Sequence, residues 1–329
     1  MVEQLLPWQQ AAWSHLQSTI NQDRVPQALL LAGPPGIGKR VLAQYYAAEI
    51  LCYNRSITEG RCHTCNSCQL MREDNHIDCI FVEAESGAQA ISIEQVRSMS
   101  ARIYQSPAVA RHKVAIMIDA DKMQEKAANA LLKTLEEPPA NTTILLLAAK
   151  PVQLPATIKS RCQVVTINSP DIALLTTHIQ QSQSVSAVDV QRAYTYAMGS
   201  PSATAALIEE GQYQAVIDMV IHVYVLRQVN IERLLSSLKT TSIEQLLHLS
   251  TRLVSDLIGY RLLGASYAAI LLSYQEAATS SALDCDIYRL YALYDQHLAL
   301  FAEYASGIVW QSNAILLSLQ HEWEQTLGT

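Results

Sequence analysis

The feature that most constrains the fold is a glycine-rich turn between a short apolar run and a helical pattern. Residues 28–32 read ALLLA, which predicts a buried strand. Residues 33–40 read GPPGIGKR, and from residue 39 to residue 53 apolar side chains recur at helical spacing. A strand, a glycine turn and a helix in this order predict a phosphate-binding loop in an α/β domain.

The loop follows the pattern G-x-x-x-x-G-K-[ST] except at its last position. Gly33, Gly36 and Gly38 let the backbone curl so that its N–H groups face phosphate oxygens, and Lys39 would reach the outer phosphates. Arg40 stands where a hydroxyl would bind Mg²⁺, and a guanidinium cannot ligate a cation. A chance glycine turn is the alternative. The loop predicts phosphate binding, leaves ATP binding open, and lacks a metal ligand that hydrolysis needs.

A second apolar run, 114–118, ends in Asp119, where nucleotide-hydrolysing proteins carry a metal-associated carboxylate. The next residue is Ala120, where a hydrolytic motor would carry the glutamate that activates water. A simple turn role is the alternative for Asp119, and together with Arg40 these residues predict a poor ATPase. A third run lies at 143–148, and strands alternating with helices indicate a mostly parallel sheet covered on both faces.

Four clustered cysteines have the spacing C-x9-C-x2-C-x2-C, which predicts a closed, structural Zn²⁺ site. The predicted ligands are Cys52, Cys62, Cys65 and Cys68. Iron–sulfur and free thiols are the alternatives, although a ferredoxin pattern needs a cysteine where Arg72 stands, and His63 offers a substitute ligand. We expect Cys79, Cys162 and Cys285 to be small buried side chains. Such cysteine usage favours a reducing cytoplasm.

Composition divides the chain. The first 168 residues carry 16 basic and 15 acidic side chains (net +1), and the remainder carries 7 and 15 (net -8), so the whole chain has a net charge of -7. This acidic balance disfavours an independent DNA binder. All 11 prolines lie between Pro7 and Pro201, so long helices are expected beyond them. The predicted domains are 1–168 (α/β, with the cysteine insertion at about 52–68), 169–208 (small, helical) and 209–329 (larger, helical).

Neither a secretory leader nor a membrane span is expected. Met1–Gln4 has no basic region followed by an apolar run. The most apolar stretch, Leu257–Tyr274, contains Arg261 and two glycines, which predicts a buried helix. We therefore expect a cytoplasmic protein without a membrane partner.

One tripeptide, Ser160-Arg161-Cys162, follows the third predicted strand. Taken alone it predicts only an exposed structural arginine. Residues 129–139 read NALLKTLEEPP, and together with this tripeptide they resemble the AAA+ clamp-loader subunits of bacterial replication. The cysteine cluster directly follows the phosphate-loop helix, as it does in bacterial loader subunits.

The resemblance implies a RecA-like AAA+ domain, a helical lid and an all-α collar through which five loader subunits form an open ring. That ring, driven by its motor subunits, opens the sliding clamp and places it on primed DNA. With Arg40 and Ala120, the chain is most similar to the non-hydrolysing stator of that family, which implies that Arg161 acts in trans as an arginine finger. Ser202 replaces the lid arginine of the motors, and Ala148-Ala149-Lys150 lacks their threonines.

Two other hypotheses compete with the stator. The first is a catalytically active AAA+ motor subunit, favoured by the intact glycine turn and Lys39. The second is a zinc-knuckle nucleic-acid binder, which the acidic balance and the lack of an aromatic–basic stripe disfavour.

Overall fold

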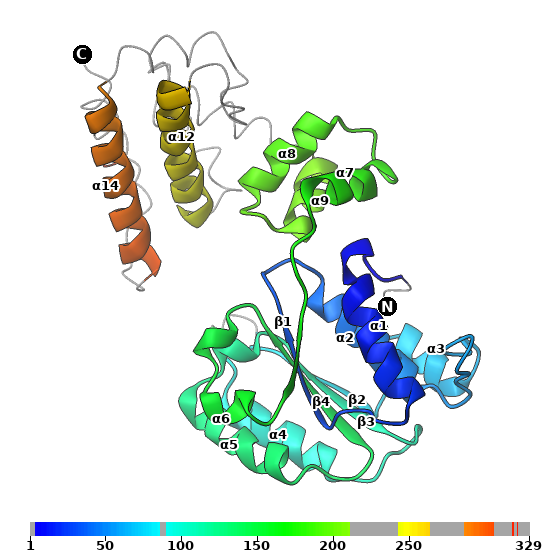
Figure 1. Ribbon diagram of the computed structural model, residues 1–329. Helices are drawn as coiled ribbons and strands as arrows, with labels where there is room; N and C mark the ends of the chain where they lie inside the picture. The colour runs from blue at the N-terminus through cyan, green and yellow to red at the C-terminus, as the bar shows by residue number, and fades with distance from the viewer. Residues whose placement is uncertain are drawn as a thin grey trace. The chain divides into compact units, whose positions relative to one another are not determined.

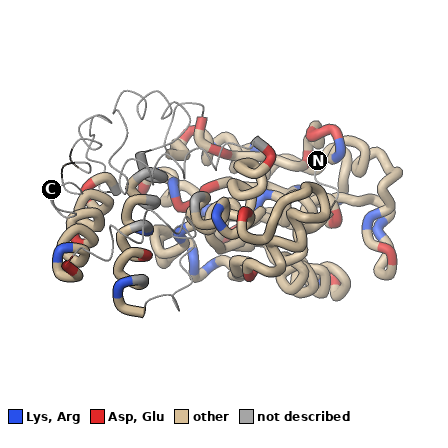
Figure 2. The backbone as a smooth tube through the Cα atoms, turned by 90° about the horizontal axis from the view of Figure 1, so that it is seen from above, with Lys and Arg blue, Asp and Glu red and all other residues tan. Residues whose placement is uncertain are grey.

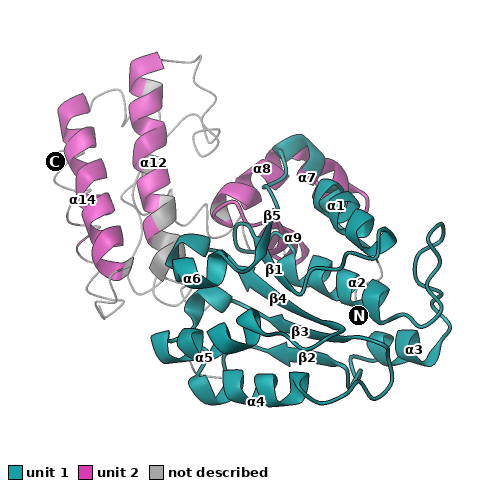
Figure 3. Ribbon diagram, turned by 60° about the horizontal axis from the view of Figure 1, so that its bottom comes forward, with its two compact units in different colours: residues 1–174 teal, residues 175–329 magenta. Residues whose placement is uncertain are grey.

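The computed structural model describes residues 4–85, 90–210, 243–263 and 286–305, together with Ser318 and His321. The chain separates into two compact units, residues 1–174 and 175–329 (Figures 1 and 3). The first unit combines a sheet with helices, and the secondary structure described in the second is entirely helical. The sequence-predicted domain limits at residues 168 and 208 stay predictions.

Five parallel strands form one sheet in the order β2-β3-β4-β1-β5. They are β1 (Ala28–Ala32), β2 (Cys79–Val82), β3 (Lys113–Met117), β4 (Thr142–Ala148) and β5 (Gln163–Thr166). Leu29 of β1 aligns with Leu145 of β4 on one side and with Gln163 of β5 on the other. The predicted runs at 28–32, 114–118 and 143–148 match β1, β3 and β4 to within one residue, whereas β2 and β5 were not predicted.

Helices cover both faces of the sheet. Successive side chains of a strand point to opposite faces, so each buried strand packs against helices on both sides. Leu29 and Leu31 pack with α1 and α2, while Ala28 and Leu30 pack with α4, α5 and α6 (Figure 1). This arrangement confirms the predicted α/β class with a parallel sheet. The helices and 3-10 turns of the first unit are η1 (Pro7–Gln9), α1 (Gln10–Asn21), α2 (Lys39–Leu51), α3 (Asn66–Arg72), α4 (Ile93–Ile103), η2 (Ala120–Lys122), α5 (Glu125–Glu136), η3 (Pro151–Gln153) and α6 (Ala156–Lys159).

Short helices occupy the region that joins the two units and the start of the second: α7 (Ile172–Gln180), α8 (Ala187–Tyr196) and α9 (Pro201–Glu210). The sequence predicts that residues 169–208 are helical, and α9 continues two residues beyond that range. Gly199, with a φ angle of 74°, separates α8 from α9, and Pro201 is the first residue of α9.

Two longer helices, α12 (Ile243–Leu263) and α14 (Ile287–Ala305), pack side by side in the second unit (Figure 1). A buried polar pair lies between them: Ser250 Oγ is 2.6 Å from His297 Nε2. His297 Nδ1 lies 2.7 Å from the Leu293 carbonyl oxygen, which only accepts, so the imidazole carries its proton on Nδ1.

Leu257–Leu263 of the apolar stretch belong to α12, and the rest of that stretch lies outside the described residues. Among the helices that the structure describes, none combines the length and apolar character needed to cross a membrane. Basic and acidic residues are interspersed along the described backbone (Figure 2).

Candidate functional site

The candidate phosphate loop spans Gly33–Arg40, from the end of β1 into the first two residues of α2. Gly36 and Gly38 have φ angles of 68° and 85°, in the left-handed region that other residues rarely adopt. A Cβ on Gly33 would stand 2.5 Å from the carbonyl oxygen of Ile167. Each of the three glycines therefore meets a steric need of this turn.

Lys39, the first residue of α2, folds back against the loop and is only 8% exposed. Its Nζ donates to the carbonyl oxygens of Gly33 and Pro34 at 2.7 and 2.8 Å. Burial lowers the pKa of Lys39, and the carboxylates of Asp119 and Asp121 act in the opposite direction. The ammonium is therefore held inside the loop, within electrostatic reach of two acidic side chains.

The N-terminal segment fastens the loop, a feature that the sequence did not predict. Trp8 Nε1 donates to the Ile37 carbonyl oxygen at 3.0 Å. Gln9 is fully buried, and its Nε2 donates to the carbonyl oxygens of Ile37 and Gly38 at 3.2 and 2.7 Å. Its Oε1 accepts the Leu6 N–H at 3.2 Å. A contact between residues 28 positions apart leaves no local pattern. Gln9 is followed directly by Gln10, and the sequence does not distinguish the two.

Arg40 already has an acidic partner. Its Nη1 lies 3.1 Å from Oε2 of Glu83, which follows β2, and both side chains are about half exposed. The guanidinium carbon is 5.8 Å from the centre of the Phe81 ring. The position therefore offers a guanidinium in an ion pair rather than a hydroxyl for a metal ion.

The acidic side of the loop is made by the turn after β3. Asp119 has a φ angle of 53°, and its Oδ2 lies 2.8 Å from Lys122 Nζ. Residue 120 is an alanine and has no carboxylate. Its side chain is fully buried in the core under α4 and α5. Asp121 Oδ2 accepts the Lys150 N–H at 2.7 Å, and its Oδ1 is buried without a hydrogen-bond partner among the described residues. Sequence reasoning missed Asp121, because it follows the strand end by several residues.

The four predicted metal ligands come together. The Sγ atoms of Cys52, Cys62, Cys65 and Cys68 all lie within 4.8 Å of one another. Cys52 directly follows α2, whereas Cys65 and Cys68 belong to the start of α3. Thiolates about 2.3 Å from a tetrahedral Zn²⁺ are roughly 3.8 Å apart, and the Cys52 and Cys62 sulfurs are 3.6 Å apart. The donor set and its spacing therefore fit a closed zinc site.

Backbone groups prepare one of these thiols as a ligand. The N–H groups of Thr64 and Cys65 lower the pKa of Cys62 to about 6. Burial raises the pKa of Cys68, which lies in the interior of the cluster. A bound cation would offset this burial cost, because metals bind the thiolate. His63 lies in the turn with a φ angle of 58° and is not one of the clustered ligands.

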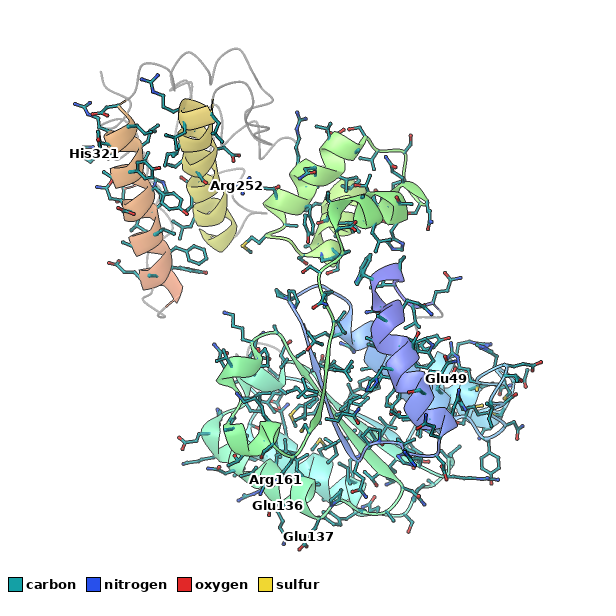
Figure 4. All side chains as sticks on the ribbon, viewed as in Figure 1. Glu49, Glu136, Glu137, Arg161, Arg252 and His321 are labelled. Carbon is teal, nitrogen blue, oxygen red and sulfur yellow. The ribbon has the colours of Figure 1, made fainter. Side chains whose placement is uncertain are left out.

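A buried carboxylate anchors the cysteine insertion to α2. Glu49 Oε2 lies 2.9 Å from Arg55 Nε, and its Oε1 accepts the Arg61 N–H at 3.3 Å (Figure 4). Arg55 Nη2 in turn donates to Asn21 Oδ1 at 2.6 Å, at the end of α1. The insertion is therefore fixed to the domain by charged hydrogen bonds in addition to any metal.

A second anchor passes through His76. Ser67 Oγ donates to the Leu51 carbonyl oxygen at 2.6 Å and lies 2.8 Å from His76 Nε2. His76 Nδ1 accepts the Asp78 N–H at 3.1 Å. Although burial acts to raise the pKa of Asp78, backbone N–H groups of residues 108–110 hold it below its usual range. The chain Ser67–His76–Asp78 thus ties α3 to the sheet edge.

Arg161 lies between α6 and β5 and is held at the surface. Its Nη2 is 2.7 Å from Oε1 of Glu136, the last residue of α5, and its Nη1 donates to the Thr157 carbonyl oxygen at 2.8 Å (Figure 4). The two sequence segments that carried the family resemblance, 129–139 and 160–162, therefore meet in space.

The structure does not bring Arg161 to the phosphate loop. In the parallel register Leu29 aligns with Gln163, so Arg161 lies before the amino end of β5, whereas Gly33 follows the carboxyl end of β1. At about 3.3 Å per residue, the two lie roughly 20 Å apart along the strands. Arg161 therefore cannot serve the loop of its own chain.

The remaining cysteines behave as packing groups where they are described. Burial raises the pKa of Cys79 to about 12 and that of Cys162 to about 11. Cys162 packs against the core under α4 and α5. Cys285 lies outside the described residues.

Comparison with known proteins places this domain. Residues 8–171 match the family model described as DNA polymerase III, delta subunit. The DNA polymerase III subunit delta' of Pseudomonas aeruginosa is 42% identical over 158 residues, which cover 48% of this chain and 47% of the relative. The subunit delta' of Escherichia coli is 31% identical over 209 residues, 64% of this chain and 62% of the relative. The chain thus spans about half to three fifths of the length of these relatives.

A relative with a different subunit name and a solved structure also match. The subunit tau/gamma of Haemophilus influenzae is 31% identical over 164 residues, 50% of this chain and 23% of the relative. A gamma-subunit-related protein of Thermotoga maritima superposes with a TM-score of 0.46 at 15% identity, over 96% of this chain and 99% of that one. The family resemblance seen in the motifs is confirmed by the sequence relatives: through residues 8–171 the chain belongs to the family of DNA polymerase III delta' subunits.

Proposed function

We propose that this chain is a non-hydrolysing stator subunit of the replicative sliding-clamp loader. It supports ATP-driven loading of the clamp onto primed DNA and supplies Arg161 in trans to a neighbouring motor subunit. The observation that carries the proposal is Arg40, paired with Glu83 in place of a metal-binding hydroxyl, in a chain whose relatives are named delta' subunits.

Hydrolysis needs a metal ion bridging the outer phosphates and a group that orients the attacking water. Arg40 cannot ligate Mg²⁺, and Asp119 is neutralised by Lys122 at 2.8 Å. Ala120 is buried in the core and offers no carboxylate to water. The metal-binding hydroxyl and the water-orienting carboxylate of a hydrolytic site are therefore absent, and its metal-associated carboxylate is paired with a lysine.

Arg161 supports the in trans role by its position. It lies at the edge of the sheet opposite the chain's own phosphate loop, and about a third of its side chain is exposed. A planar guanidinium with permanent charge suits the γ-phosphate of another subunit. The neighbour's nucleotide is thus the one that this arginine serves.

The partners follow from the same proposal. They are the motor subunits and the delta subunit of a pentameric ring, and the sliding clamp and primed DNA are reached through the complex. Any DNA polymerase activity belongs to the holoenzyme assembly, and the location is the cytoplasm. The described helices α12 and α14 belong to the part of the chain that would form the ring collar.

Two ligands are part of the proposal. Cys52, Cys62, Cys65 and Cys68 hold a structural Zn²⁺ that supplies a fixed tetrahedral centre for the insertion and no open position for chemistry. The loop retains Lys39 and its glycines, so nucleotide binding without turnover is consistent with its geometry.

The test is ATP turnover by the isolated chain with Mg²⁺, compared with a Lys39→Ala variant. We expect the two proteins to give the same background rate. An active motor subunit is the competing function, favoured by the intact Lys39 loop. Mg²⁺-dependent hydrolysis that disappears in Lys39→Ala would establish it and end the stator proposal.

A further inference from the structure

The guanidinium of Arg161 lies where two helices end. Glu136, the last residue of α5, accepts from Nη2 at 2.7 Å, and Thr157, in the short helix α6, accepts from Nη1 through its carbonyl oxygen at 2.8 Å. Ser160 Oγ lies 3.4 Å from Nη1. Three groups from two elements thus surround one side of the guanidinium.

Electrostatics favours this arrangement. The last carbonyl groups of a helix lack partners within it and carry partial negative charge, which attracts a cation. A carboxylate at the same end of a helix is unfavourable by itself, because it faces that negative charge. The Glu136 carboxylate is therefore unfavourable at the end of α5 by itself, and its ion pair with Arg161 offsets this electrostatic cost.

The contacts also leave the arginine able to act. A guanidinium has five N–H donors, more than Glu136, Thr157 and Ser160 engage. A free arginine side chain samples many rotamers, and a phosphate would have to select the productive one. An arginine already fixed in direction, with donors remaining, meets an incoming phosphate without that ordering cost.

We infer that Glu136 is a positioning residue for Arg161: its carboxylate sets the direction of the guanidinium before a neighbouring subunit's nucleotide arrives. This inference rests on the proposed in trans role of Arg161. Glu137, the next residue, provides a matched control, because it is also an exposed carboxylate at the end of α5. The backbone of Glu137 makes two hydrogen bonds: its N–H donates to the Lys133 carbonyl oxygen at 3.1 Å, and its carbonyl oxygen accepts from Tyr104 Oη at 3.1 Å.

The experiment is a double-mutant cycle in the reconstituted loader with clamp and primed DNA. Glu136→Gln, Arg161→Ala, their combination and Glu137→Gln are compared for kcat and KM of ATP hydrolysis. We expect Glu136→Gln to lower kcat by roughly 1.5- to 5-fold, the effect of one exposed ion pair, with KM for ATP unchanged. Glu137→Gln should match the unmodified subunit. In the Arg161→Ala background, Glu136→Gln should change nothing further.

The outcomes distinguish a failure of the positioning role of Glu136 from a failure of the proposed in trans role of Arg161. If Arg161→Ala itself leaves turnover unchanged, the proposed function fails and the inference with it. If Arg161→Ala lowers kcat but Glu136→Gln does not, the inference alone is overturned. A loss from Glu136→Gln that persists in the Arg161→Ala background means that Glu136 acts on the fold, which also overturns positioning.

Discussion

Arg40 Nη1 lies 3.1 Å from Glu83 Oε2, which joins the first turn of the phosphate-loop helix to the end of β2. The pair occupies the place where a hydrolytic loop would present a hydroxyl to Mg²⁺. This position therefore presents a cation where a hydrolytic loop would bind one.

Restoring the hydroxyl alone should not restore hydrolysis. Arg40→Thr removes an ion pair that is half exposed, so we expect a loss of no more than about 1 kcal/mol in the free energy of unfolding. Ala120 still offers no carboxylate to water, so turnover should stay at background. Urea unfolding and an ATPase assay measure the two effects. Mg²⁺-dependent turnover in this single variant would mean that Arg40 is the sole defect.

Gln9 should matter to the loop far more than its neighbour. Gln9→Ala leaves the Ile37 and Gly38 carbonyl oxygens without the donor that reaches them from the buried side chain. We expect a loss of about 1–3 kcal/mol in the free energy of unfolding. Gln10→Ala, at an exposed position of α1, should stay within about 0.5 kcal/mol. Equal effects in urea unfolding would show that Gln9 does not fasten the loop.

The cysteine cluster should carry one zinc per chain. Cys65→Ser removes a ligand, so we expect loss of the metal and faster proteolysis between residues 52 and 79. Chelation of the unmodified chain should have the same effect. His63→Asn, at the exposed left-handed position of the same turn, should keep the metal. Metal analysis and limited proteolysis decide, and unchanged protease resistance after confirmed metal loss would contradict a structural role.

His112 should make the first unit sensitive to mild acid. Burial lowers the pKa of His112 to about 4, and its Nε2 lies 2.9 Å from Thr143 Oγ1. His112 is protonated below about pH 6.5 in the unfolded chain but only below about pH 4 in the folded chain. The free energy of unfolding therefore falls as the pH decreases from about 6.5 to about 4. The loss should approach about 3 kcal/mol.

His112→Gln should remove that share of the pH dependence, since the amide can still donate to Thr143 without titrating. The matched variant is His15→Gln, at an exposed position of α1. Urea unfolding at pH 7 and pH 4.5 gives the difference for each protein. A pH dependence that is the same in His112→Gln as in the unmodified chain would contradict this assignment.

The interior of the sheet could be predicted from the sequence, and its edges could not. β1, β3 and β4 are buried on both faces, so they read as continuous apolar runs. β5 has exposed side chains at three of its four positions, and β2 is only four residues long, so neither produces a clear pattern.

The candidate site divides in a similar way. The candidate cysteine ligands and the glycine turn are local in sequence, so spacing alone predicts them. Gln9 and Asp121 act through partners 28 and 29 residues away, and such contacts leave no periodic signal. The ion pair of Arg161 with Glu136 likewise depends on how α5 and α6 end beside each other.

The proposed role of Arg161 is to complete the site of a neighbouring subunit, and Arg161→Ala in the assembled loader is the sharpest test of that role. The measurement is ATP turnover stimulated by clamp and primed DNA, with incorporation of the variant verified by native mass. Loss of an arginine finger costs about 10³-fold or more at its site. We therefore predict that the Arg161→Ala subunit is fully incorporated and that turnover falls by at least the share of one motor site. Arg161→Lys should restore turnover only in part, because an ammonium lacks the planar fork of a guanidinium. Undiminished turnover with the Arg161→Ala subunit fully incorporated would rule out a finger role for Arg161.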